Sequence, residues 1–185
     1  MGFLPNSHFT ELREIKMDIG GQHDMDDKAI QFVNSLIGKK LVHFCCEVEI
    51  LDFSFDPLAL HAMGCSRVIK NNDSLVTTLD YQSWDQMEST NNDEWFNMKR
   101  FHSEIVGGTV TSVAINSWHD LHIELDNGVT IECLIANAYP HFEEELEQWV
   151  LFEPTNKTKE HSGTLLAVYN KHVEFRNRSV LHSDM

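Results

Sequence analysis

Two segments that alternate apolar and polar residues flank the triplet Asp126-Asn127-Gly128. The apolar positions are Leu121, Ile123 and Leu125 before the triplet and Val129, Ile131 and Cys133 after it. A period of two is typical of half-buried strands, so the segment predicts a β-hairpin. A two-residue turn would place apolar residues opposite polar ones, whereas a three-residue turn pairs apolar with apolar. Because a slip of one residue turns every side chain to the other face, we expect the three-residue turn, with Gly128 in the left-handed conformation.

A similar pattern occurs earlier in the chain. Residues 37–44 resemble residues 106–113, and residues 51–56 resemble residues 121–126, although Pro57-Leu58 replaces Asn-Gly in the turn. A duplication and independent hairpin patterning both explain this similarity. In either case the strand Trp149–Phe152 is expected to take the place in the later unit that Leu75–Leu79 takes in the earlier one.

These patterns predict a mainly antiparallel β fold of the α+β class, in which two similar β-meander units form a sandwich or an open barrel. We expect a single domain of 185 residues. Its parts are a flexible N-terminal arm, a first β unit at about 37–79, a helix or loop insertion at 80–105, a second β unit at about 106–176 and a flexible C-terminal tail. Short helices are expected near 27–37 and 92–105. The first would be capped by Asp26 or Asp27 and would bury Ile30, Val33 and Ile37.

The charge of the chain limits its partners. Fourteen basic residues against 29 acidic ones give a net charge of −15, which disfavours nucleic acid and anionic membranes as ligands. No apolar run approaches the length of a membrane span, and the first residues do not predict a secretory signal. The four cysteines include no CxxC pair and are expected to be buried, reduced thiols. We therefore expect a cytoplasmic protein.

The sequence contains none of the common nucleophile, phosphate-binding, dinucleotide-binding or zinc motifs. Its 11 histidines are scattered, and His119 and His122 are spaced so that they would face opposite sides of a strand. We therefore expect no metal, no cofactor and no enzymatic activity, and binding remains as the function to consider.

Two stretches combine acidic and aromatic residues, at 80–95 and 139–149. Aromatic side chains among like charges are typical of an interface whose rim steers an oppositely charged partner. The alternative is that the tryptophans belong to the core and the acids to a solvated face. The predicted partner-binding residues are Asp80, Tyr81, Trp84, Asp85, Asp93, Glu94, Glu143, Glu144 and Glu147.

Several segments together resemble the small acidic immunity proteins of bacterial polymorphic-toxin and contact-dependent growth-inhibition systems. They are the G-x-x-V-x-x-V strand at 107–113, the hairpin LHIELDNGV at 121–129, its echo at 38–56 and the closing WVLFEP at 149–154. The resemblance implies a cytosolic protein without catalytic activity that binds one cognate toxin, often a basic nuclease, and blocks it. The alternative is a β-barrel or accessory protein that holds a small molecule between the two β units.

Overall fold

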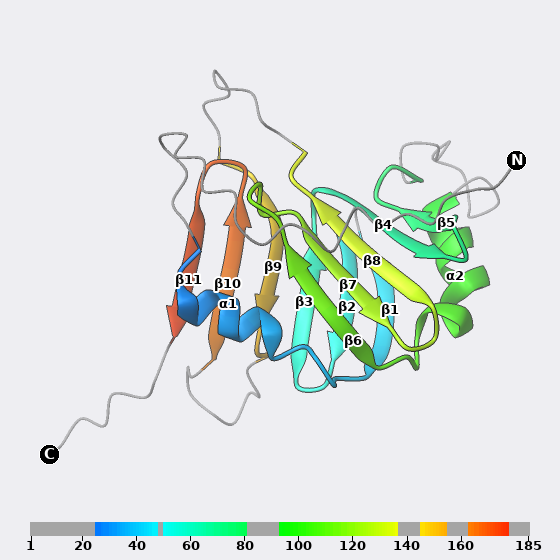
Figure 1. The fold of residues 1–185 in the computed structure, drawn as a ribbon. Coiled ribbons are helices and arrows are strands. Elements are labelled where there is room, and N and C mark those ends of the chain that lie inside the picture. Colours follow the sequence, from blue (N-terminus) through cyan, green and yellow to red (C-terminus); the bar gives the residue numbers. More distant parts are fainter. Residues whose placement is uncertain (1–24, 48–49, 81–92, 137–144, 155–162, 178–185) are drawn as a thin grey trace, which may run out of the picture.

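The computed structural model describes residues 25–47, 50–80, 93–136, 145–154 and 163–177. Two helices and eleven strands lie in these ranges (Figure 1). The helices are α1 (Asp27–Asn34) and α2 (Asp93–Ile105). The strands of the first half are β1 (Leu41–Glu47), β2 (Ile50–Phe55), β3 (Leu58–Ala62), β4 (Cys65–Lys70) and β5 (Asp73–Thr77). Those of the second half are β6 (Val110–Ile115), β7 (Leu121–Leu125), β8 (Val129–Leu134), β9 (Glu147–Phe152), β10 (Thr164–Tyr169) and β11 (Val173–Asn177).

The strands form two antiparallel sheets that face each other. One has six strands in the order β1-β2-β3-β9-β10-β11, and the other has five in the order β5-β4-β8-β7-β6. Buried side chains from both sheets belong to one hydrophobic core, and its largest members include Trp149, Phe44, Phe53 and Phe55. The predicted class, mainly antiparallel β with two short helices, is confirmed.

The hairpin β7–β8 has the predicted register. Leu121 pairs with Cys133 and Ile123 pairs with Ile131, and all four side chains are buried. The Gly128 N–H donates to the Leu125 carbonyl oxygen at 3.1 Å, and Gly128 has a φ of +79°. The alternation of apolar residues therefore determined both the length of this turn and the residue that adopts the left-handed conformation.

The two β units repeat the same geometry. In the first, β1 pairs with β2 through Leu41–Phe55 and Phe44–Phe53, with a bulge between Leu41 and His43. In the second, β6 pairs with β7 through Val110–Leu125 and Val113–Ile123, with a bulge between Val110 and Ser112. The β2–β3 hairpin differs from its counterpart β7–β8 at the turn, because Phe55 pairs with Leu58 and only two residues lie between them.

The two units meet through reciprocal backbone hydrogen bonds. The Gly38 N–H donates to the Val110 carbonyl at 2.9 Å, and the Gly107 N–H donates to the Leu41 carbonyl at 2.7 Å. Both glycines have positive φ, +82° and +96° respectively. Each unit thus donates from the N–H of a glycine and accepts at the carbonyl of the residue that begins its first strand. Such reciprocal contacts are those of two units related by a two-fold axis.

The centre of this contact is an isolated antiparallel bridge between Lys40 and Thr109, which are equivalent positions of the two units. An approximate two-fold axis therefore passes between them. The strand orders of the two sheets follow the same relation, which matches the meander β1-β2-β3 to β6-β7-β8 and the hairpin β4–β5 to β9–β10.

The hairpins β4–β5 and β9–β10 are exchanged between the two units. Strand β4 leaves the first meander and pairs with β8, and β9 leaves the second meander and pairs with β3. The strand Trp149–Phe152 was expected to match Leu75–Leu79. This expectation was wrong. Trp149–Phe152 belongs to β9, which is equivalent to β4, whereas β5, which contains Leu75, is equivalent to β10.

The helices lie at opposite ends of the sandwich (Figure 1). α2 packs against the edge strands β1 and β5, which belong to different sheets. α1 lies beside β10 and β11, where the Phe32 and Phe175 ring centroids are 6.0 Å apart. No helix in the described ranges is long and apolar enough to cross a membrane.

The first helix begins as predicted but buries a different face. Asp26 caps it, because its Oδ1 atom accepts from the Ala29 N–H at 2.7 Å. Val33 is buried, whereas Ile30 and Ile37 are 43% and 49% exposed. The predicted stripe was therefore wrong at two of its three positions, because the core packs against Ala29 and Leu36 beside Val33.

All four cysteines are free thiols. Cys133 is buried, and burial raises its pKa to about 12. Cys45, Cys46 and Cys65 are only half-buried, so the prediction of buried thiols holds for Cys133 alone.

Candidate functional site

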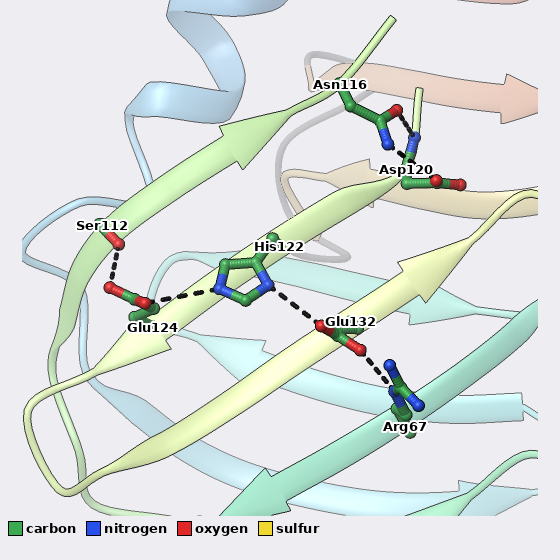
Figure 2. Close-up of polar contacts among 7 residues, drawn as sticks. All are labelled: Arg67, Ser112, Asn116, Asp120, His122, Glu124 and Glu132. Carbon is green, nitrogen blue, oxygen red and sulfur yellow. Dashed lines mark hydrogen bonds and ion pairs between the residues drawn. The ribbon is translucent and has the colours of Figure 1, made fainter. Parts of the chain in front are cut away.

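The outer face of the five-stranded sheet carries a continuous row of polar contacts, shown in Figure 2. Side chains that alternate with the buried ones on β6, β7, β8 and β4 form it. We call this set the polar row, and it consists of Ser112, Glu124, His122, Glu132 and Arg67. The row crosses four strands because the strand registers bring its members next to one another.

His122 lies between the two carboxylates of the row. Its Nε2 atom is 3.5 Å from Glu124 Oε1, and its Nδ1 atom is 3.4 Å from Glu132 Oε1. Glu132 also accepts from the Arg67 guanidinium. Glu132 is thus shared by two cationic partners when His122 is protonated, whereas Arg67 contacts Glu132 alone within the row.

Glu124 is the exposed carboxylate of the row, with 54% of its side chain accessible. Ser112 Oγ donates to Glu124 Oε2 at 2.7 Å, and this bond is the main reason that the pKa of Glu124 lies below its ordinary value. His122 lowers the pKa further, and partial burial opposes both effects. Glu124 therefore carries its negative charge at neutral pH and presents it to solvent in a fixed position.

The contacts of the row do not make a nucleophilic site. Ser112 donates to Glu124 and not to His122, whereas an activated serine needs its hydroxyl on the imidazole base. No group of three or more histidine, cysteine, aspartate or glutamate side chains suited to a metal ion occurs in the part of the chain that the structure describes. The arrangement is suited to receiving a cationic group from a partner.

The β6–β7 loop lies to one side of the polar row, where β6 ends and β7 begins, as Figure 2 shows at Asn116 and Asp120. Asn116 Oδ1 accepts from the backbone N–H groups of Trp118 and Asp120, at 2.9 and 3.0 Å. Asp120 accepts from Asn116 Nδ2 at 2.8 Å and from the Ile135 N–H at 2.7 Å. These bonds fix the loop to itself and to the end of β8.

The predicted partner-binding residues occupy separate regions. Asp80 follows β5, where its carboxylate accepts from the Thr77 N–H and hydroxyl, each at 3.0 Å. Glu147 begins β9 in the other sheet and accepts from the Tyr169 hydroxyl at 2.9 Å. The structure therefore does not bring the described members of the two acidic stretches together.

Asp93 and Glu94 lie at the start of α2, the position at which acidic residues favour a helix. The remaining predicted residues, Tyr81, Trp84, Asp85, Glu143 and Glu144, lie outside the described residues.

Sequence reasoning missed both the polar row and Trp118. The row depends on cross-strand neighbours, and the bulge in β6 shifts those neighbours by one residue. Trp118 did leave a signal: the alternation of β6 and β7 stops between Asn116 and Asp120, and an apolar residue in such a gap points away from the core.

The chain matches no protein-family model, no curated protein and no solved structure.

Proposed function

We propose that this chain is an immunity-type inhibitor that binds a cognate toxin domain, a basic one of nuclease type, and covers its active site. The observation that carries the proposal is the acidic outer face of the five-stranded sheet. There Asp120, Glu124 and Glu132 contribute carboxylates, and Arg67 is the permanently charged cation of the polar row. A net charge of −15 would steer this face towards a basic partner over a distance.

The packing between the sheets favours an outer binding surface over an internal ligand site. Trp149, Phe44, Phe53 and Phe55 are completely buried in the space where a small molecule between the two β units would have to lie. A ligand of that kind would need these rings to move, at the cost of close core packing.

Co-expression tests the proposal. The chain is produced together with the toxin domain encoded immediately upstream, and cell survival and complex formation are measured. Glu124→Lys should abolish or strongly reduce protection, because a lysine would face the lysines and arginines of the toxin. The variant should still fold cooperatively, because Glu124 is exposed, and its melting temperature should fall only by the amount that loss of the Ser112 hydrogen bond causes. Association should also slow as salt is added, because screening shortens the reach of the charges.

Matched variants locate the surface. Glu174→Lys reverses a charge on β11 of the other sheet and should leave protection intact. Asp85→Lys with Glu94→Lys, and Glu144→Lys with Glu147→Lys, test the two acidic stretches predicted from the sequence. If Glu124→Lys protects fully while one of these variants fails, the binding face is elsewhere. If the unaltered chain gives no protection, the immunity function itself is wrong.

A further inference from the structure

We propose that Trp118 is the anchor residue of the interface with a basic protein partner, and this inference rests on the proposed function. Trp118 is 65% exposed, the highest value among the exposed large hydrophobic residues of the described chain. Partly exposed tryptophans are expensive to leave in water and are the residues most enriched among interface hot spots.

The loop that carries Trp118 is built as a rigid three-residue hairpin turn. Asn116 and Asp120 pair across it, with the Asn116 N–H 3.2 Å from the Asp120 carbonyl oxygen and the His119 N–H 3.0 Å from the Asn116 carbonyl oxygen. Trp118 is the central residue of this turn. In the equivalent connection Glu47 of β1 pairs with Ile50 of β2, and two residues separate them in the sequence, so the three-residue turn belongs to the second unit.

His119, the third residue of the turn, has a φ of +66°. The same position in the β7–β8 turn is Gly128, and a residue with a Cβ is strained in this conformation. His119 is 8% exposed, and its carbonyl oxygen accepts from Trp149 Nε1 of the core at 2.9 Å. The surroundings therefore hold His119 in a strained conformation, and the backbone of Trp118 is fixed before any partner arrives. Preorganisation of this kind reduces the entropy that binding has to overcome.

Charge decides the kind of partner. Asp120 closes the same turn, and Glu124 lies further along β7 on the outer face. An aromatic side chain in a turn closed by a carboxylate, on a chain with a net charge of −15, fits a basic protein surface with an apolar pocket, and the negative charge repels nucleic acid.

The probe for the experiment is the toxin domain encoded immediately upstream, titrated with the full-length chain. Trp118→Ala should raise the Kd by about thirtyfold or more, the loss expected of a hot-spot residue. Trp118→Phe should restore part of the affinity. Val42→Ala removes another exposed apolar side chain, 52% accessible on β1, and should leave the Kd unchanged. Melting curves of all variants should coincide with that of the unaltered chain.

Fluorescence gives an independent measurement. The acrylamide quenching of the unaltered chain minus that of Trp118→Phe reports the accessibility of Trp118, and this difference should disappear when the toxin domain is added. Three results overturn the inference: an unchanged Kd for Trp118→Ala, a Trp118 that stays accessible in the complex, or a chain that self-associates through Trp118 in ultracentrifugation without the toxin domain. If the unaltered chain does not bind the toxin domain at all, the proposed function fails together with the inference. If the unaltered chain binds the toxin domain but Trp118→Ala binds it equally well, only the role of Trp118 is wrong and the proposed function stands.

Discussion

The three-residue β7–β8 turn requires a positive φ at Gly128. A Cβ added there would meet no atom within 4 Å, so the cost of a side chain comes only from the φ of +79°. Gly128→Ala should therefore lower the free energy of unfolding by about 1 kcal/mol, as measured from urea denaturation. Gly128→Asn should cost less, because asparagine tolerates the left-handed conformation. Equal stability of the alanine variant and the unaltered chain would contradict this account.

Glu124 contributes to the stability of the folded protein in a way that depends on pH. Its pKa in the folded protein lies below the ordinary value of 4.5, mainly because Ser112 donates to it. The stabilisation is therefore fully present above pH 4.5 and is lost as the pH falls through the folded pKa. Glu124→Gln should be less stable than the unaltered chain at neutral pH, and the difference should shrink below pH 4.5.

Thermal unfolding measured between neutral and acidic pH checks this prediction. Ser112→Ala removes the largest cause of the lowered pKa and should flatten the same part of the profile. A Glu124→Gln profile parallel to that of the unaltered chain at all pH values would be inconsistent with a lowered pKa.

At the scale of elements, the β7–β8 turn does more than connect two strands. Asn127 Nδ2 lies 3.2 Å from the Glu104 carbonyl oxygen and 3.3 Å from the Ile105 carbonyl oxygen, so it satisfies acceptors at the end of α2. A Cβ at Gly108 would collide with the Asn127 side chain, which explains the small residue there. The turn thus fixes where α2 ends against the second meander.

Substitution of Asn127 tests this role. Asn127→Ala should destabilise the protein by about 1 kcal/mol, because two carbonyl groups lose their donor. Asn127→Asp should cost at least as much, although it is similar in shape, because a carboxylate would face carbonyl oxygens at the negative end of the helix. Chemical denaturation of the two variants distinguishes them. An aspartate variant as stable as the unaltered chain would show that the contacts do not contribute.

The elements of this fold could be predicted from the sequence because their causes are local. Alternation located the strands, the apolar pairing across Asp126–Gly128 gave the hairpin register, and Asp26 marked the start of α1. The exposed positions of Ile30 and Ile37 could not be predicted in this way, since the face that a short helix buries depends on the sheet edge beside it. The polar row likewise depends on neighbours across four strands.

At the scale of the whole molecule, the pairing of β4 with β8 and of β9 with β3 makes each sheet from both halves of the chain. No local pattern specifies this exchange, because β4 and β9 pair with strands that lie far away in the sequence. The similarity of residues 37–44 to residues 106–113 indicated two related units, and the reciprocal bonds about Lys40 and Thr109 are what two such units form when they are intertwined.

Splitting the chain tests the exchange. A fragment ending at Asp80 lacks β9 beside β3, and a fragment beginning at Asp93 lacks β4 beside β8. We expect neither fragment alone to show a cooperative thermal transition, because each exposes the apolar faces and edges that the other covers. Mixing them should restore such a transition in circular dichroism. Cooperative unfolding by one fragment alone would contradict the prediction.

The exchange of hairpins also affects when each sheet can form during synthesis of the chain. β3 leaves the ribosome long before its partner β9, and at roughly 5–20 residues per second this interval lasts several seconds. During that time the nascent first half has one sheet edge open and no second meander to cover its apolar face. The six-stranded sheet therefore cannot be completed until β9, β10 and β11 have been synthesised.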